Sequence, residues 1–255
     1  MIKSLVSAFL MYSKIPMPQI EWKEENRRYS LGFFPLVGAV EGTLLCLWRV
    51  FCNFTGAGQL IFSAVSVLIP VMVTGGIHID GFCDVTDAVS SYGDKDKRLK
   101  IMSDSHVGAF AVMHLCLYFL LQTALFSEVH EVKQTVFISL GYVLSRALSG
   151  LSAVLFRSAK KDGALQDFVR PSDKKVTIAM EILFLLVSVF TITFIYPLTG
   201  ILCTVASFGV LFFCRRTAYR DFGGITGDVC GWFLQICEIF FLGVFVICKL
   251  LKVII

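Results

Sequence analysis

Seven long apolar stretches constrain the fold of this chain more than any other feature. Each approaches the roughly 20 residues that a helix needs to cross a bilayer. They lie at Leu31–Cys52, Gln59–Ile77, Val107–Phe126, Thr135–Phe156, Val176–Tyr196, Pro197–Cys214 and Val229–Cys248. Because backbone polar groups in lipid must be hydrogen-bonded internally, such stretches predict helices. We therefore predict an all-α, polytopic transmembrane bundle of about seven spans, formed by a single domain over residues 1–255.

Composition supports a membrane protein over a soluble one. The chain is 56% hydrophobic and 16% charged, whereas soluble domains carry about 25% charged residues. The nine cysteines form no CxxC pair and sit mostly inside apolar runs, which favours small buried side chains over disulfides or a zinc site. The fifth and sixth stretches run together, and the short turn signal at Tyr196 and Pro197 marks the boundary between them.

The first dozen residues are apolar but too short to span a membrane. Lys3 and Lys14 flank them, and a Pro-rich segment follows at Ile15–Pro18 without a small-residue cleavage site. This pattern predicts an interfacial helix that lies on the membrane surface rather than a signal peptide.

The basic residues are distributed unevenly between the two sides of the predicted spans. Most Lys and Arg residues precede the first stretch or follow the second, fourth and sixth, whereas the opposite side holds only Lys133, Lys249 and Lys252. Cytoplasmic loops carry such an excess of positive charge. We therefore expect a multi-pass protein of the bacterial or archaeal cell membrane, with its amino terminus and its active-site loops in the cytoplasm.

The strongest candidate for chemistry is an acidic motif after the second stretch. Asp80, Asp84 and Asp87 are spaced i, i+4, i+7, which places them within an arc of about 60° on a helix. No Lys or Arg lies among them, and Mg²⁺ binds through one or two carboxylates together with water and phosphate oxygens. The motif predicts a Mg²⁺ site; a solvated acidic face at the membrane surface is the alternative interpretation.

The segment that follows returns the chain to the membrane. Asp94 is placed to cap a short helix that runs to Met102, and Asp104 then arrives near the third stretch. Arg98 and Lys100 are suited to phosphate oxygens, although basic residues near a membrane also act as topology determinants.

A glycine-rich segment precedes the last stretch. Gly223, Gly224 and Gly227 flank Thr226 and allow close approach of the backbone to a phosphate; a tight turn is the alternative. From Asp228, a polar stripe continues along the last stretch, through Gln235 and Glu238.

Ionisable residues also occur inside the apolar stretches. Glu41 lies in the first and Arg146 in the fourth, where a charge costs about 2.5–3.5 kcal/mol near the helix centre. A structural Glu–Arg pair and a functional one are both compatible with the sequence. His114, in the third stretch, is predicted to be a packed, hydrogen-bonded residue.

Taken together, these motifs resemble the adenosylcobinamide-GDP ribazoletransferase (cobalamin synthase) family. The resemblance rests on five segments in the expected order, which are Phe9–Pro18, Phe34–Gly42, Gly75–Asp87, Ile101–Gly108 and Gly224–Asp228. Two features depart from the family pattern: Ala88 replaces an expected glycine, and residues 157–175 match poorly.

The resemblance implies a reaction in which a hydroxyl of α-ribazole, or of its 5′-phosphate, attacks the corrin-linked phosphorus of adenosylcobinamide-GDP and releases GMP. Mg²⁺ is the implied cofactor, with Asp80, Asp84 and Asp87 as its ligands. The implied catalytic residues are Asp80, Asp84, Asp87, Asp104 and Asp228. The expected substrate-binding residues are Glu41, His78, Arg98, Arg146, Gly224, Thr226, Gly227, Gln235 and Glu238. The lipid bilayer is the other expected partner and nucleic acid is not; a monomer and a homo-oligomer both fit the sequence.

Two other functions compete with this interpretation. A CDP-alcohol phosphotransferase also uses spaced aspartates at a membrane surface, but its downstream Gly-x-x-x-Asp-x-x-x-Asp pattern is missing here. A transporter would concentrate ionisable residues near the bilayer midplane and often contains inverted repeats. In this chain, those residues gather in the predicted loops, so both alternatives are less favoured.

Overall fold

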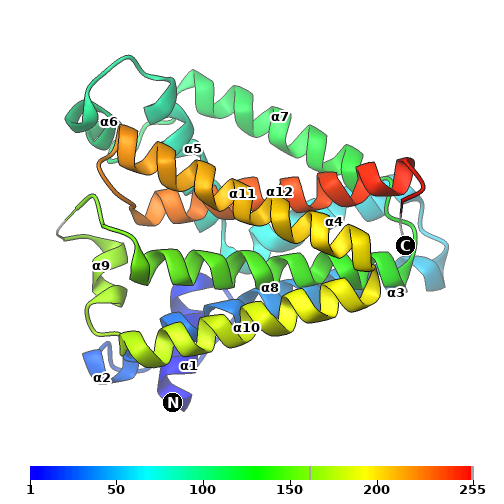
Figure 1. Cartoon of the computed structure of the whole chain (residues 1–255), viewed down its shortest axis with the longest axis horizontal. Helices are drawn as coiled ribbons and strands as arrows, with labels where there is room; N and C mark the ends of the chain where they lie inside the picture. Colours follow the sequence, from blue (N-terminus) through cyan, green and yellow to red (C-terminus); the bar gives the residue numbers. More distant parts are fainter. Residues whose placement is uncertain (161, 254–255) are drawn as a thin grey trace.

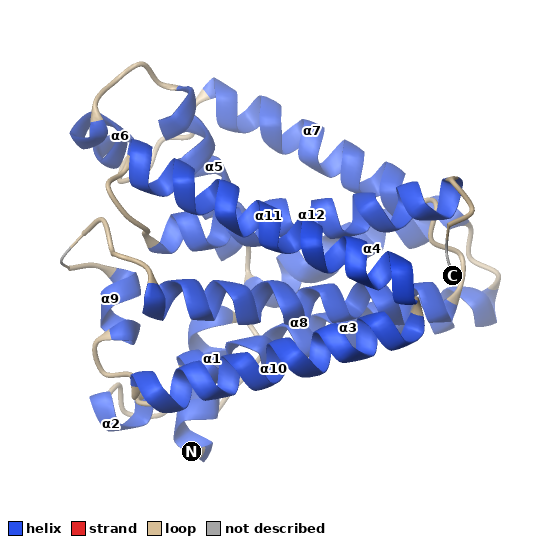
Figure 2. Cartoon of the chain, in the orientation of Figure 1, coloured by secondary structure: helices blue, strands red, loops and turns tan. Residues whose placement is uncertain are grey.

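A computed structural model describes residues 1–160 and 162–253 of the chain. Its regular elements are helices joined by loops and turns (Figure 2). Within the described residues, the one β-type pairing is an isolated parallel bridge between Ser158 and Ile225. The all-α prediction is therefore confirmed.

The helices follow one another along the chain in a fixed order. They are α1 (Ile2–Tyr12), α2 (Glu24–Arg27), the 3-10 helix η1 (Leu31–Phe33), α3 (Phe34–Thr55), α4 (Gln59–Thr74), α5 (Ile77–Ser90), α6 (Lys95–Ile101), α7 (Ala109–Phe126), α8 (Val132–Leu155), α9 (Ala164–Val169), α10 (Lys174–Ile195), α11 (Pro197–Asp221) and α12 (Gly227–Leu250). Among the described residues, six helical segments are long and apolar enough to cross a membrane, and the bent pair α4–α5 makes up to seven. The polytopic prediction is confirmed, including the break between α10 and α11 at Tyr196.

The second predicted span ends earlier than its hydropathy indicates. Gly75 and Gly76 adopt positive φ angles of 66° and 82°, a conformation that glycine enters without the penalty of a Cβ atom. Helix α4 therefore stops at Thr74, and α5 continues at an angle of 96° to it. This bend makes the acidic motif a separate helix.

The loops that carry the predicted motifs gather at one end of the bundle. Figure 1 shows α2, α6, α9 and the turn between α11 and α12 at the left end, and the carboxyl terminus at the right. The long helices run alternately between these two ends, so segments far apart in the sequence meet at the left end. The segments that follow α6 and precede α12, which carry or adjoin predicted site residues, therefore lie at the same end.

Helix α1 runs across the direction of the long helices in Figure 1. It packs beside α2, and the Ser7 hydroxyl donates to the Asn26 carbonyl at 3.0 Å. The predicted N-terminal helix is therefore present, and its position on a lipid surface stays a prediction.

Two expectations about side chains need correction. His114 is exposed on α7 rather than packed, although its Nδ1 lies 2.8 Å from the Phe110 carbonyl oxygen. All nine cysteines are free thiols, as predicted, but Cys116 is exposed and not buried.

Candidate active site

Two glycines allow α5 and α12 to pack backbone against backbone. A Cβ atom added at Gly81 would lie 2.8 Å from the Asp228 carbonyl oxygen, and one at Gly231 would lie 3.2 Å from the His78 backbone. Any larger side chain would force the two helices apart. The glycine within the acidic motif therefore brings the beginning of α12 against α5.

This packing assembles a cluster of carboxylates from two helices. Asp80, Asp84 and Asp228 lie close enough for their charges to repel one another. Asp80 is exposed, whereas Asp84 and Asp228 are half-buried. We call these three residues the acid cluster; it joins one predicted residue from the glycine-rich segment to two from the acidic motif.

Asp87 has a different set of partners. Its carboxylate accepts hydrogen bonds from the backbone N–H groups of Gly108 at 2.6 Å and Ala111 at 2.8 Å. These groups belong to the first turn of α7, which lacks intrahelical partners for them. Asp87 thus anchors α7 to α5. The predicted metal-ligand role of Asp87 would require the same carboxylate to bind a cation and these two amides.

Helix α6 forms as predicted, with the Asp94 side chain accepting from the Lys97 N–H at 2.9 Å. Asp104 follows it and is exposed. A hydrogen bond from His106 lowers the pKa of the Asp104 carboxyl, and the His106 Nδ1 lies 2.7 Å from it. The structure thus pairs Asp104 with His106, rather than with the acid cluster.

The glycine-rich segment packs against residues that the family resemblance left without a role. Ile225 donates to the Arg157 carbonyl at 2.9 Å, and Ala159 donates to the Ile225 carbonyl at 2.9 Å. A Cβ atom at Gly224 would overlap this neighbouring backbone, whereas one at Gly227 would meet open space. Gly224 therefore serves the contact between two chain segments, and Gly227 is the glycine that leaves room for a ligand.

Thr226 begins α12 as its N-cap, accepting from the Val229 N–H at 3.2 Å. Asp228 stands in the first turn of the same helix. The N-terminal end of α12, a site that favours anions, therefore opens beside the acid cluster.

Two basic side chains border the acid cluster's end of the bundle. Arg98 forms an ion pair of 2.5 Å with Asp221 at the end of α11, so part of its predicted phosphate-binding capacity is already engaged. Lys160 donates to the Ser103 hydroxyl at 3.0 Å and attracts the Asp228 carboxylate. No local sequence pattern predicts a site role for Lys160, because its position depends on the bridge between Ser158 and Ile225.

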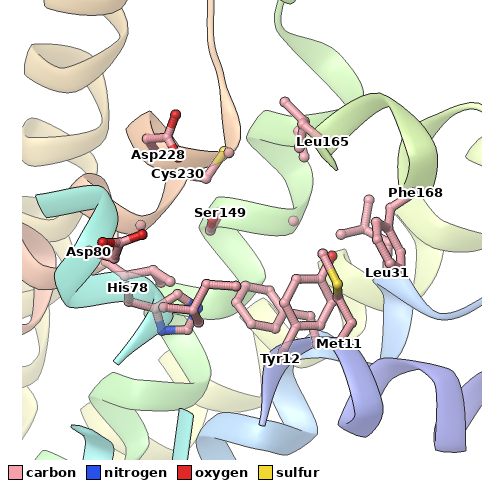
Figure 3. Close-up of a pocket in the computed structure, with 17 residues that line it drawn as sticks. Met11, Tyr12, Leu31, His78, Asp80, Ser149, Leu165, Phe168, Asp228 and Cys230 are labelled. Atoms are coloured by element: carbon pink, nitrogen blue, oxygen red, sulfur yellow. The ribbon is translucent and has the colours of Figure 1, made fainter. Parts of the chain in front are cut away.

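A cavity of about 120 Å³ opens between α1, α5, α8, α9 and α12. Figure 3 shows Asp80 and Asp228 at one end of it, and Tyr12 and Phe168 at the other. His78 lines the wall and is buried, and its Nδ1 has no hydrogen-bond partner. Gly227 also lines the cavity, so the predicted residues His78, Asp80, Gly227 and Asp228 share one hollow.

The predicted intramembrane residues form a separate network deeper in the bundle. Arg146 bridges Glu41, at 2.6 Å, and Glu238, and all three side chains are buried. Nearby in α12, Gln235 accepts from the Tyr118 hydroxyl at 2.7 Å. None of these residues lines the cavity. Their contacts are those expected of a structural Glu–Arg pair, one of the two alternatives that the sequence left open.

A further buried acid, Glu181 on α10, was not among the site residues predicted from the sequence. Its side chain is fully buried, and neither carboxyl oxygen has a hydrogen-bond partner. It lies against Gly150, which lines the cavity. Its position could have been noticed from the sequence, because Glu181 is an acidic residue inside the predicted span Val176–Tyr196. Ionisable residues within spans are rare and often mark functional sites.

The acid cluster fits a hard divalent cation in its donor chemistry. It offers only carboxylate oxygens, and Mg²⁺ uses one or two of these with water and phosphate completing its shell. Among the described residues, no preformed group of three His, Cys, Asp or Glu ligands occurs. The residues present therefore suit a cation whose coordination shell is completed by substrate phosphate oxygens, rather than a cation bound by protein ligands alone.

The family described as cobalamin-5-phosphate synthase matches residues 4–246. The chain belongs to this family. A relative from Lachnoclostridium phytofermentans, named adenosylcobinamide-GDP ribazoletransferase, is 40% identical over 93% of this chain and 91% of its own length.

Further relatives of the cobalamin-5-phosphate synthase family carry the same name. One from Clostridium botulinum strain Alaska E43 is 30% identical over 97% of this chain and 98% of its own length. One from Geobacillus sp. strain WCH70 is 32% identical over 92% of this chain and 93% of its own length. No solved structure matches the chain. The family match favours neither of the competing functions, a CDP-alcohol phosphotransferase or a transporter.

Proposed function

We propose that this chain is an adenosylcobinamide-GDP ribazoletransferase. A hydroxyl of α-ribazole, or of its 5′-phosphate, attacks the corrin-linked phosphorus of adenosylcobinamide-GDP. A new P–O bond forms, the bond to the GMP oxygen breaks, and the hydroxyl proton is released. The products are GMP and adenosylcobalamin or its 5′-phosphate.

The observation that carries this proposal is the meeting of Asp80 and Asp84 with Asp228 beside the N-terminus of α12, in a chain that belongs to the family along most of its length. Phosphoryl transfer requires positioning and neutralisation of charge more than covalent chemistry by the protein. Carboxylates that hold a cation, next to free backbone N–H groups, supply both.

The roles of individual residues follow from their positions. Asp80, Asp84 and Asp228 would hold Mg²⁺, which supplies charge neutralisation for the pyrophosphate. Gly227 leaves the first turn of α12 open to a phosphate oxygen, and Lys160 adds a positive charge at the same place. Asp87 positions α7 against α5 through the Gly108 and Ala111 amides.

We also place the acid cluster on the cytoplasmic side of the cell membrane. The end of the bundle that holds the cluster also holds the segments rich in Lys and Arg (Figure 1), as expected for cytoplasmic loops. Nucleotide substrates would reach the site from that side.

Purified protein in detergent or nanodiscs tests the activity directly. With adenosylcobinamide-GDP, α-ribazole and Mg²⁺, we expect GMP and adenosylcobalamin in equal amounts. Product formed instead from a CDP-alcohol and a polyol acceptor would support the phospholipid synthase. Absence of any GMP release from folded protein would contradict the proposal.

A further inference from the structure

The cavity beside the acid cluster has a wall built from a row of aromatic rings. His78 lies edge-on to Phe34 with ring centroids 5.8 Å apart, Phe34 lies 4.3 Å from Tyr12, and Tyr12 lies 5.8 Å from Phe168. All four residues line the cavity. Such a wall favours a flat aromatic ligand.

The size of the cavity limits what part of a substrate it accepts. Its volume is about 120 Å³, and an apolar cavity of roughly 150 Å³ is known to hold a single benzene ring. A corrin macrocycle is many times larger. The cavity therefore excludes the corrin, and a two-ring base enters it only if the walls move apart.

The polarity of the wall discriminates between the bases present in the two substrates. Guanine carries several donors and acceptors, and each buried group left without a partner costs about 1–3 kcal/mol. The benzimidazole base of α-ribazole is apolar except for one free ring nitrogen. Most of the cavity lining is apolar, including Met11, Leu31 and Leu165, and such a wall suits benzimidazole better than guanine.

The position of the cavity orients the rest of that substrate. Figure 3 places Asp80 and Asp228 at one end and Tyr12 and Phe168 at the other, with His78 between them. A base held against the rings would therefore leave its ribose at the acid cluster, where the attacking hydroxyl is required.

We propose that this cavity is the subsite for the aromatic base of the acceptor nucleoside, which packs against the rings of Tyr12, Phe34 and His78. This inference rests on the proposed function and adds which substrate occupies which part of the site. His78 contributes a ring to the cavity wall and takes no part in bond formation. Corrin and GDP remain outside the cavity, beside the acid cluster.

A pair of matched substitutions tests the location. Leu165 lines the cavity from α9 and is half-buried, so Leu165→Trp fills the hollow. Leu202→Trp is the matched control, since Leu202 is exposed on α11. We expect Leu165→Trp to raise the KM for α-ribazole about tenfold, equivalent to about 1.4 kcal/mol, with the KM for adenosylcobinamide-GDP unchanged. Equal effects on both substrates, or no difference from the control, would overturn the location.

Wild-type protein provides a test that no folding defect can obscure. Free 5,6-dimethylbenzimidazole should compete with α-ribazole and should not compete with adenosylcobinamide-GDP. Failure to compete with α-ribazole, in a preparation that releases GMP, refutes the subsite while leaving the proposed function intact. A preparation that is folded but releases no GMP refutes the proposed function, and the subsite with it.

Discussion

Replacement of the buried guanidinium of Arg146 should destabilise the whole bundle. Arg146 is fully buried and bridges the carboxylates of Glu41 and Glu238, which are also buried. In Arg146→Met, a side chain of similar reach remains, but two carboxylates lose their counter-charge. Breaking a buried ion pair in this way costs about 3–5 kcal/mol.

That cost predicts a measurable change in thermal stability. For chains of 150–250 residues, each kcal/mol shifts Tm by about 2–4 °C, so the expected decrease is about 6–20 °C. A thiol-reactive fluorophore can follow unfolding in detergent, because six of the nine cysteines, including Cys203 and Cys237, are buried in the folded chain. Arg216→Met, at an exposed position, controls for loss of a positive charge alone.

Replacing all three charged residues of the network by neutral ones should restore most of the thermal stability lost in Arg146→Met. The triple variant Glu41→Gln, Arg146→Met, Glu238→Gln removes the unpaired charges, and buried ion pairs replaced by neutral groups are often near-neutral in stability. We expect its Tm to lie nearer the wild type than to Arg146→Met. An unchanged Tm for Arg146→Met, or a triple variant as unstable as the single one, would refute the reasoning.

Three further changes test other parts of the account. Gly81→Val places a Cβ atom against the Asp228 backbone and should reduce GMP release at least about tenfold; Gly209→Val, where a Cβ atom meets no neighbour, should not. Asp87→Ala removes the acceptor for two amides of α7 and should cost about 0.5–2 kcal/mol of stability, seen as a lower Tm; a wild-type Tm would rule out the cap. Tyr92→Cys, in a chain without other cysteines, should react with an impermeant thiol reagent only in inverted vesicles, and labelling of intact cells would contradict the cytoplasmic assignment. Tyr92 suits this test because it is 97% exposed, whereas Cys83 is buried.

The membrane spans could be predicted from the sequence because they depend on a local property of the chain. Hydropathy over about 20 residues determines whether a segment can cross a bilayer, and the break at Tyr196–Pro197 appears directly in the residues. The bend after α4 was harder to predict, since hydropathy runs on through Gly75 and Gly76 to Ile77. Only the positive φ angles of the two glycines end the helix there.

The composition of the acid cluster was only partly predictable. Helical spacing correctly placed Asp80 and Asp84 on one face of α5. It could not show that Asp87 is engaged by the amides of α7, because that contact depends on how two helices pack. Asp228 and Lys160 reach the site through long-range packing at Gly81 and the bridge to Ile225, which no local pattern encodes.

The central claim is that the acid cluster performs phosphoryl transfer with a bound cation. The most direct measurement is the rate of GMP release by Asp84→Asn across a Mg²⁺ titration, with Asp96→Asn on exposed α6 as the matched control. Loss of about 4 kcal/mol of transition-state stabilisation predicts a rate about a thousandfold below the wild type in protein that remains folded, with the control unaffected. A near-normal rate and an unchanged Mg²⁺ midpoint in Asp84→Asn would contradict the account.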